Sequence, residues 1–337
     1  MIKYKKSKVA INLVTWQAEK YLPLLFKSIS EQTYNNFSVL VIDNASSDNT
    51  VSFLKEYYPQ VKIIVNKNNI GFARAHNQAI HWTDSIYILC LNQDVILDPN
   101  FLKICLNFLD KNDQIAALTG KILNWDSLKQ QPTNIIDTTG LKVLKSHQVI
   151  DRGQKEIDTG QYQEITEIFG VSAACAIYRR AALEKVKYNL EYFDENFFSY
   201  KEDVDLAYRL RLTGLKAYYL PAAIAYHNRT AALGEFANNK EIIKNRQKKN
   251  KFINYYSYKN HLFTLIKNEF LVNFIKYFSQ IFIYELKKFL YILFFEQKTL
   301  KALIEFFKLL PQMLKKRRYL KKNIVKIKAK DLSKWYE

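Results

Sequence analysis

Polar side chains stand directly after apolar runs at three places early in the chain. Thr15 follows INLV, Asp43 follows VLVI and Asp94 follows ILCLNQ. Ligands of open α/β sheets bind beyond the carboxyl ends of the strands, so these residues are the first candidates for chemistry. A single Asp at such a place is more often the N-cap of the next helix. Because Asp43 and Asp94 both lie several residues ahead of the next helical pattern, their coincidence favours a functional site.

A second acidic group lies in the run KEDVDLAYRLR. Its carboxylates have a structural explanation, because acidic residues stabilise the first turn of a helix and Asp205 can pair with Arg209 one turn later. A carboxylate can also act as a general base toward a hydroxyl. We expect the structural role for Asp205 and Arg209, whereas the residues alone leave both roles open for Asp203.

His227 follows the strand-like run YYLPAAIAY. Imidazole can ligate Mn²⁺ or donate a hydrogen bond to a phosphate, whereas a lone His is more often structural. The two roles are equally supported by the residue alone.

Short apolar runs alternate with helical patterns between residues 9 and 119, and these elements must position the candidates. The expected strands are VAINLV, FSVLVI, VKIIV, SIYILCL and IAALT, and the expected helices lie near residues 22–32, 49–57, 71–82 and 100–109. Continuous apolar strands that alternate with helices indicate a mostly parallel sheet covered on both faces. The sequence therefore predicts a doubly wound α/β fold.

The pattern changes after Gly120. Residues 121–166 are polar and weakly patterned, and the apolar segment IFGVSAACAIYRR, the acidic run and the strand-like LKAYYL follow. From about Lys240 the composition is helical, with Lys mixed among Phe, Ile, Leu and Tyr. We expect a catalytic α/β domain over residues 1–239 and a helical basic region over residues 240–337.

The positive charge of the chain is concentrated in that second part. The formal net charge is +19, of which residues 240–337 carry +17. Lys clusters interleaved with aromatic residues suit an anionic membrane surface or a nucleic acid. The apolar run NFIKYFSQIFIYELKKFLYILFF between the clusters favours the membrane, because a nucleic-acid binder needs no such load of Phe, Ile and Leu. A helical bundle packed on the catalytic domain, with a solvated Lys face, is the structural alternative.

Cysteine usage and the lack of targeting segments indicate the cytosol. Cys90, Cys105 and Cys175 are odd in number, widely spaced and set in apolar runs, which fits buried thiols in a reducing compartment. The N-terminal run has no secretory signal, and no uncharged stretch reaches the roughly 18 to 20 residues that span a bilayer. We expect a cytoplasmic protein bound peripherally to the inner face of the cell membrane, with no nucleic-acid partner.

Five segments, taken in order, resemble one known family. They are INLVTWQAEKYLPLLFKSISEQTY, VLVIDNASSDNT, NNIGFARAHNQAI, LCLNQDVILDPNFL and YKEDVDLAYRLRLTG. From Val9 to about His227 the chain resembles the family 2 glycosyltransferases of GT-A fold, especially their bacterial rhamnosyltransferase-like branch. Each segment is a weak signal by itself, and five in the family's order are a strong one. A dinucleotide-dependent oxidoreductase is disfavoured, because VTWQAEKYL lacks the glycine fingerprint expected after the first strand.

The resemblance implies roles for the residues near the donor. The nucleotide sugar would be bound by Thr15, Asp43, Asn69 and Asn92. Asp94 would take the last position of the family's DxD-type motif and hold a divalent cation, Mg²⁺ or Mn²⁺, with His227 near it. The motif here reads Asn-Gln-Asp and has one carboxylate in place of two.

The resemblance also implies the catalytic residues and the reaction. The Glu202-Asp203 pair matches the family's ED motif, with Asp203 as the general base of an inverting enzyme and Glu202 in an orienting or acceptor-binding role. The implied reaction moves a sugar from dTDP-rhamnose or a UDP-hexose to a hydroxyl of a glycan, expected to be lipid-linked, in cell-surface polysaccharide synthesis. The alternative is a noncatalytic protein that binds a membrane or a nucleic acid through residues 240–337.

Overall fold

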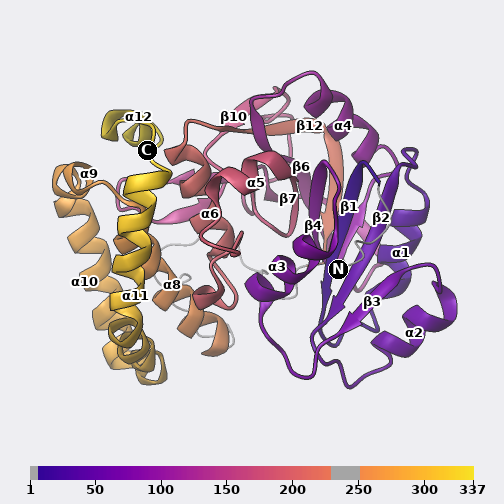
Figure 1. Ribbon diagram of the computed structural model, residues 1–337, viewed down its shortest axis with the longest axis horizontal. Coiled ribbons are helices and arrows are strands. Elements are labelled where there is room, and N and C mark those ends of the chain that lie inside the picture. Colours follow the sequence, from indigo (N-terminus) through magenta and orange to yellow (C-terminus); the bar gives the residue numbers. More distant parts are fainter. Residues whose placement is uncertain (1–6, 229–250) are drawn as a thin grey trace.

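The structure is a computed structural model that describes residues 7–228 and 251–337. The boundary predicted between residues 239 and 240, and most of the Lys-rich run that follows it, lie outside these residues. A ten-stranded sheet forms the centre of the first part, and helices from the end of the chain gather beside it (Figure 1).

The early elements follow the predicted alternation of strands and helices. They are β1 (Val9–Thr15), α1 (Leu22–Ser30), β2 (Phe37–Asp43), α2 (Thr50–Tyr57), β3 (Lys62–Val65), α3 (Phe72–Trp82), β4 (Tyr87–Asn92), β5 (Val95–Leu97), α4 (Phe101–Asp110) and β6 (Ile115–Asp126). Strand β6 continues well beyond the predicted IAALT. Except for β3, their strands are nearly continuous in burial, as in VAINLVT of β1, which is why the apolar runs were readable as strands.

The remaining strands and helices of the first part come from the stretch with little pattern and from the segments after it. They are β7 (Gln131–Thr138), β8 (Leu141–Val143), β9 (Val149–Asp151), β10 (Thr166–Ile168), β11 (Cys175–Arg179), α5 (Arg180–Val186), η1 (Glu195–Phe197), α6 (Glu202–Leu212) and β12 (Lys216–His227). The strands of residues 121–166 are short or half exposed, so their side chains give no clear period along the sequence.

The main sheet is mixed and mostly parallel. Its strand order is β10-β12-β6-β11-β4-β1-β2-β3, with β5 paired to β12 and β7 to β6. Strand β1 runs parallel to β2 and β4, β2 runs parallel to β3, and β12 runs parallel to β6, whereas β11 is antiparallel to β4 and β6. The predicted α/β class is therefore confirmed.

Two glycines permit close backbone contacts in this fold. A Cβ on Gly120 of β6 would lie 2.0 Å from the carbonyl oxygen of Ala223 in β12, where the pairing of the two strands shifts register. A Cβ on Gly71, just before α3, would lie 2.6 Å from the carbonyl oxygen of Phe198. The turn before α3 is thus packed against the segment that leads into α6.

The cysteines are buried free thiols, as predicted. Cys90, Cys105 and Cys175 all lie in the core around the sheet, and none forms a disulfide. Burial raises the pKa of the Cys105 thiol well above its ordinary value, so this group is unreactive.

The last part of the chain is helical, also as predicted. It contains α8 (Lys251–Asn268), α9 (Leu271–Lys276), α10 (Phe278–Phe295), η2 (Gln297–Leu300), α11 (Lys301–Asn323) and α12 (Ala329–Ser333). Helices α8 and α11 pack on each other, and α8 also packs on α6. Among the described residues, no helix combines the length and apolar character needed to cross a membrane.

Candidate active site

Parallel pairing of β1 and β2 brings Thr15 and Asp43 side by side at the ends of their strands. Both are fully buried, and the Thr15 hydroxyl donates to Asp43 Oδ2 at 2.9 Å. Ser46 donates to the same carboxylate from its backbone N–H at 2.9 Å and from its hydroxyl at 2.6 Å. A carboxylate has about four acceptor positions, so these three donors hold Asp43 in place and leave capacity for one more.

Asn69 lies in the turn before α3. Its Oδ1 accepts a hydrogen bond from the backbone N–H of Gly71 at 2.9 Å, and Gly71 has a φ of 83°. Asn69 therefore shapes the turn that contacts Phe198. The resemblance implied contact of Asn69 with the nucleotide, and this role stays a prediction.

The end of β4 is tied to the ends of its neighbours by backbone hydrogen bonds. Asn92 N–H donates to the carbonyl oxygen of Ala174 at 2.8 Å. The Gln93 side chain accepts from Trp16 N–H at 2.8 Å and donates to the Trp16 carbonyl at 3.1 Å. Gln93 thus joins the end of β4 to the residue after Thr15.

Asp94 and His227 meet because β5 pairs with the end of β12. The His227 Nε2 lies 3.2 Å from Asp94 Oδ1, and its Nδ1 lies 2.8 Å from Asp137 Oδ2. Burial alone would lower the pKa of His227, but Asp94 and Asp137 outweigh it and raise the pKa to about 9. The imidazole is therefore held between two carboxylates in a fixed orientation.

Asp137 is a residue of this site that the sequence did not indicate. It lies in β7, within the stretch that has no readable pattern, and it is buried. Its contact with His227 depends on the distant pairing of β7 and β12 with β6. No local signal in the sequence could have revealed it.

The polar groups at this end fit a cation only in part. Among the described residues, no group of three or more His, Cys, Asp or Glu could hold a metal ion. Asp94 and His227 supply two ligands, and Mg²⁺ in nucleotide enzymes is usually held by one or two carboxylates together with substrate phosphates. A histidine that ligates a metal commonly binds a carboxylate through its other nitrogen, as His227 binds Asp137. The pair therefore fits a cation that the donor also ligates.

Glu202 and Asp203 begin α6, as the acidic run predicted. Asp203 Oδ2 accepts from Ala173 N–H at 3.2 Å, and Oδ1 accepts from Val204 N–H at 2.7 Å. Glu202 is buried, and burial together with the Asp203 charge raises the pKa of Glu202 well above its ordinary value. The protonated form of Glu202 is thus favoured more than in an exposed glutamate.

The structural role expected for Asp205 and Arg209 is confirmed. Arg209 Nε lies 2.9 Å from Asp205 Oδ2, and both side chains are buried. Arg209 also donates to the carbonyl of Val186 at 2.7 Å and to that of Tyr192. This pair fixes α6 within the fold and takes no part in the open end of the site.

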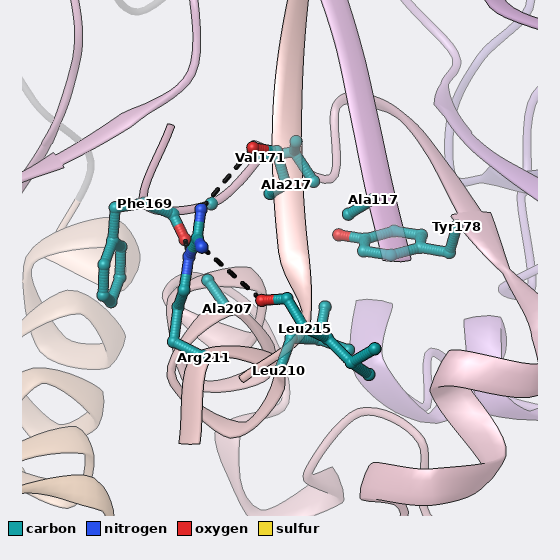
Figure 2. Close-up of a pocket in the computed structure, with 10 residues that line it drawn as sticks. Ala117, Phe169, Val171, Tyr178, Ala207, Leu210, Arg211, Leu215 and Ala217 are labelled. Carbon is teal, nitrogen blue, oxygen red and sulfur yellow. Dashed lines mark hydrogen bonds between the residues drawn. The ribbon is translucent and has the colours of Figure 1, made fainter. Parts of the chain in front are cut away.

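Arg211 anchors the other side of α6 to the sheet. It donates to the carbonyl oxygen of Phe169 at 2.9 Å and pairs with Glu167. Figure 2 shows Arg211 beside a small cavity lined mostly by apolar side chains, including Tyr178 and Ala207. The cavity is about 10 Å³, roughly the space for one water molecule, so it is a packing defect and not a substrate site.

One line of alternating hydrogen bonds and peptide bonds joins several of the predicted site residues. It runs from Thr15 through the next residue to Gln93 and Asn92, then to the Ala173-Ala174 backbone and to Asp203. Asp94 and His227 adjoin it after Gln93. Residues that are far apart in the sequence therefore lie near one another at the carboxyl-terminal ends of the strands.

Comparison with protein families agrees with this arrangement. The profile of the family described as "Glycosyl transferase family 2" matches residues 11–187, which is more than half of the chain. The chain belongs to glycosyl transferase family 2. The resemblance in the sequence is thereby confirmed.

Relatives of this family 2 glycosyltransferase carry related descriptions. An N-acetylglucosaminyl-diphospho-decaprenol L-rhamnosyltransferase of Mycobacterium tuberculosis is 28% identical over 245 residues, covering 66% of this chain and 76% of the relative. An uncharacterized glycosyltransferase of Haemophilus influenzae is 33% identical over 113 residues, covering 33% of this chain and 35% of the relative. The chain thus matches only about a third of the length of that relative.

Solved structures confirm the fold. TarS 1-349 of S. aureus in complex with UDP has a TM-score of 0.51 at 16% identity, covering 97% of this chain and 89% of that one. GalNAc-T7 with UDP, GalNAc and Mn²⁺ has a TM-score of 0.56 at 12% identity, covering 77% of this chain and 48% of that one. The fold is therefore the GT-A fold expected from the sequence.

Proposed function

We propose that this chain is an inverting glycosyltransferase that moves a sugar from a nucleotide-sugar donor to a hydroxyl of a lipid-linked glycan. The observation that carries the proposal is the hydrogen-bonded line from Thr15 to Asp203 along one edge of the sheet. This line supports the proposal because it connects the proposed nucleotide-binding residue Thr15 with the proposed base Asp203.

The donor end rests on Thr15 and Asp43. The remaining acceptor position of the Asp43 carboxylate suits an N–H of the base or a ribose hydroxyl. Asn92, at the end of β4, and Asn69, in the turn before α3, complete the proposed donor contacts. The donor is dTDP-rhamnose or a UDP-hexose. Relatives described as acting on diphospho-polyprenol acceptors, with L-rhamnose or with UDP-Glc, support this choice of donors and acceptors.

The catalytic step assigned to Asp203 is proton removal from the acceptor hydroxyl. As the acceptor oxygen forms its bond to the anomeric carbon, its proton passes to Asp203 and the bond from that carbon to the donor diphosphate breaks. One displacement inverts the configuration of the sugar. Glu202, buried beside Asp203, has the orienting or acceptor-binding role.

A divalent cation would be held by Asp94 and His227. When bound there, Mg²⁺ or Mn²⁺ would stabilise the negative charge of the departing diphosphate. Asp137 holds the His227 ring through Nδ1, which directs Nε2 toward Asp94.

The membrane part of the proposal rests on an apolar ridge along α9, α10 and α11. Helix α10 buries Ile281 and Ile292, yet its outer side is also apolar. We use the term apolar ridge for the exposed large apolar side chains of these helices, which are Leu271, Val272, Ile275, Phe278, Phe282, Ile283, Leu286, Leu290, Leu293, Phe294, Phe295, Ile304, Phe307 and Leu314.

The ridge holds 14 of the 24 exposed large apolar residues found in the part of the chain that the structure describes. On α10, Phe278, Phe282, Leu286 and Leu290 recur every four residues and so lie along one side of the helix. Exposed lysines stand among them, such as Lys287 and Lys308. An apolar stripe bordered by lysines suits a helix that lies in the interface of an anionic bilayer.

Nucleoside diphosphate release tests the enzymatic proposal. The purified chain is incubated with dTDP-rhamnose or a UDP-hexose, with Mg²⁺ or Mn²⁺ and with a lipid-linked glycan. We expect release with one donor, and a loss of at least about a hundredfold in kcat for Asp203→Asn, since this general base should contribute on the order of 10²–10⁴. Full activity of Asp203→Asn, or no turnover with any donor, would contradict the assignment.

Vesicle sedimentation tests the membrane proposal. We expect the chain to bind vesicles that contain anionic lipid, and Phe282→Glu with Phe294→Glu to release it. The control is Leu128→Glu with Leu190→Glu, which adds the same charge at side chains that are 95% and 70% exposed outside the ridge, and it should bind as the wild type does. Binding to RNA or DNA that outcompetes these vesicles at physiological salt would favour the nucleic-acid alternative.

A further inference from the structure

The segment that leads into Glu202 and Asp203 has an unusual backbone. Phe198, Tyr200 and Lys201 have φ values of 62°, 69° and 68°. At Phe198 the chain makes a γ-turn, in which Ser199 N–H donates to the Phe197 carbonyl at 2.7 Å. Non-glycine residues rarely adopt such angles and keep them only when the surroundings hold them. Lys201 also forms the N-cap of α6, so its conformation determines where the first helical turn begins.

A single side chain of α8 holds this segment from outside. The Asn260 amide Nδ2 donates to the carbonyl oxygens of Phe197 at 2.8 Å, Ser199 at 3.0 Å and Tyr200 at 2.7 Å. Asn260 is fully buried. Its amide has two N–H groups, so the three carbonyls share the whole donor capacity of the side chain.

Two buried lysines of the helical part fix the surroundings of the same segment. Lys316 of α11 lies 2.6 Å from Asp194 and 2.8 Å from Glu191. Lys267 of α8 contacts Asp194 and lies 2.6 Å from Asp205. Asp194 precedes the segment and Asp205 follows it in α6, so these lysines fix both of its ends.

We propose that Asn260 is a positioning residue for the base Asp203, with Lys267 and Lys316 fixing the ends of the segment that it holds. The inference rests on the proposed function, because it takes Asp203 as the base. It assigns a catalytic contribution to helices outside the α/β domain. Without Asn260, residues 197–201 relax toward ordinary backbone angles, α6 begins differently, and Asp203 no longer faces the acceptor hydroxyl.

A comparison of kcat with donor affinity tests the proposal. We expect Asn260→Ala to lower kcat at least tenfold, while the Kd for the nucleoside diphosphate, measured by calorimetry, stays within twofold of the wild type. The control is Asn254→Ala, which removes a buried amide of the same helix that donates to Glu296 at 3.2 Å. The control should leave kcat within twofold.

A second variant covers the case in which Asn260→Ala fails to fold. Lys316→Met is expected to lower kcat with unchanged nucleotide affinity, Lys316→Arg to restore part of it, and Lys315→Met, at an exposed neighbour, to change neither. A kcat within twofold of the wild type in a folded Asn260→Ala or Lys316→Met protein overturns the inference. So does a kcat that falls only in proportion to the folded fraction. A wild-type chain that is inactive with every donor counts against the proposed function instead.

Discussion

Two regions of the molecule hold buried carboxylates by different means. At the ends of β1 and β2, Asp43 accepts hydrogen bonds from the neutral groups of Thr15 and Ser46, one on the paired strand and one three residues away. Ahead of α6, Asp194 is held by the cations Lys267 and Lys316, which lie 73 and 122 residues further along the chain. The first arrangement is local to one sheet edge, and the second requires the fold to be complete.

The partners of a buried carboxyl group also determine the direction in which its pKa shifts. Burial alone would raise the pKa of Asp194, but Lys267 and Lys316 outweigh it and hold that pKa well below its usual range. Glu269, between α8 and α9, is also buried but is bound by the Tyr336 hydroxyl, and burial raises the pKa of Glu269 to about 7. Direct contact with two lysines therefore offsets burial at Asp194, whereas the Tyr336 hydroxyl and the Arg317 charge do not offset burial at Glu269.

The largest expected effect is a loss in the free energy of unfolding when a buried lysine that contacts Asp194 is replaced. Lys267→Met leaves Asp194 and Asp205 with fewer cations in a buried place, and breaking such pairs costs about 3–5 kcal/mol. Urea unfolding followed by circular dichroism measures the loss. Lys308→Met, at an exposed lysine of α11, is the control. A loss of unfolding free energy below about 1 kcal/mol would show that the buried lysines around Asp194 stabilise the fold no more than the neutral partners of Asp43 do.

The second effect is a pH dependence at Glu269. Because the folded-state pKa is raised to about 7 from an ordinary value of 4.5, the folded state binds the proton more tightly, and stability falls as pH rises from about 4.5 through 7. The Glu269→Gln variant has no carboxyl at this position, so its stability should not fall for this reason as the pH rises. Relative to the wild type, its stability should rise between pH 5 and pH 8 by on the order of 2–3 kcal/mol in urea unfolding. An unchanged difference across that range would refute the assignment.

A smaller effect, on nucleotide affinity, is expected at Asp43, whose hydrogen-bond donors are neutral groups. Thr15→Val removes one hydrogen bond to Asp43, which is worth about 1 kcal/mol, and lets the carboxylate turn away from the nucleotide. We expect UDP or dTDP to bind roughly fivefold more weakly by calorimetry. Thr33→Val, a comparable change at an exposed hydroxyl that bonds to the Pro99 carbonyl, should leave the affinity unchanged.

The smallest effect on the free energy of unfolding is expected for a solvent-exposed ion pair. Lys27 and Glu31 lie one turn apart on α1 at 3.9 Å, and both are largely exposed. Lys27→Met should change the unfolding free energy by less than about 0.5 kcal/mol. A larger change would mean that charge pairing by itself, and not burial, explains the behaviour of Lys267.

The same contrast explains how far the sequence could be read. Thr15 and Asp43 were predictable, because each follows a continuous apolar strand and parallel pairing brings such strand ends together. The start of α6 at Glu202 was predictable from its acidic first turn. Asp137 and Asn260 were not, because their roles depend on contacts with residues 90 and about 60 positions away. From the sequence, the lysines of residues 240–337 were expected to lie at the surface. Nothing in the composition of that part reveals that Lys267 and Lys316 are buried.

The apolar ridge also determines how the purified protein should behave. Side chains such as Phe294 and Phe295, at 67% and 66% exposure, would face water in a plain buffer. Many large exposed apolar side chains on α9, α10 and α11 favour self-association. We therefore expect the chain to form concentration-dependent aggregates that a mild detergent or anionic lipid disperses.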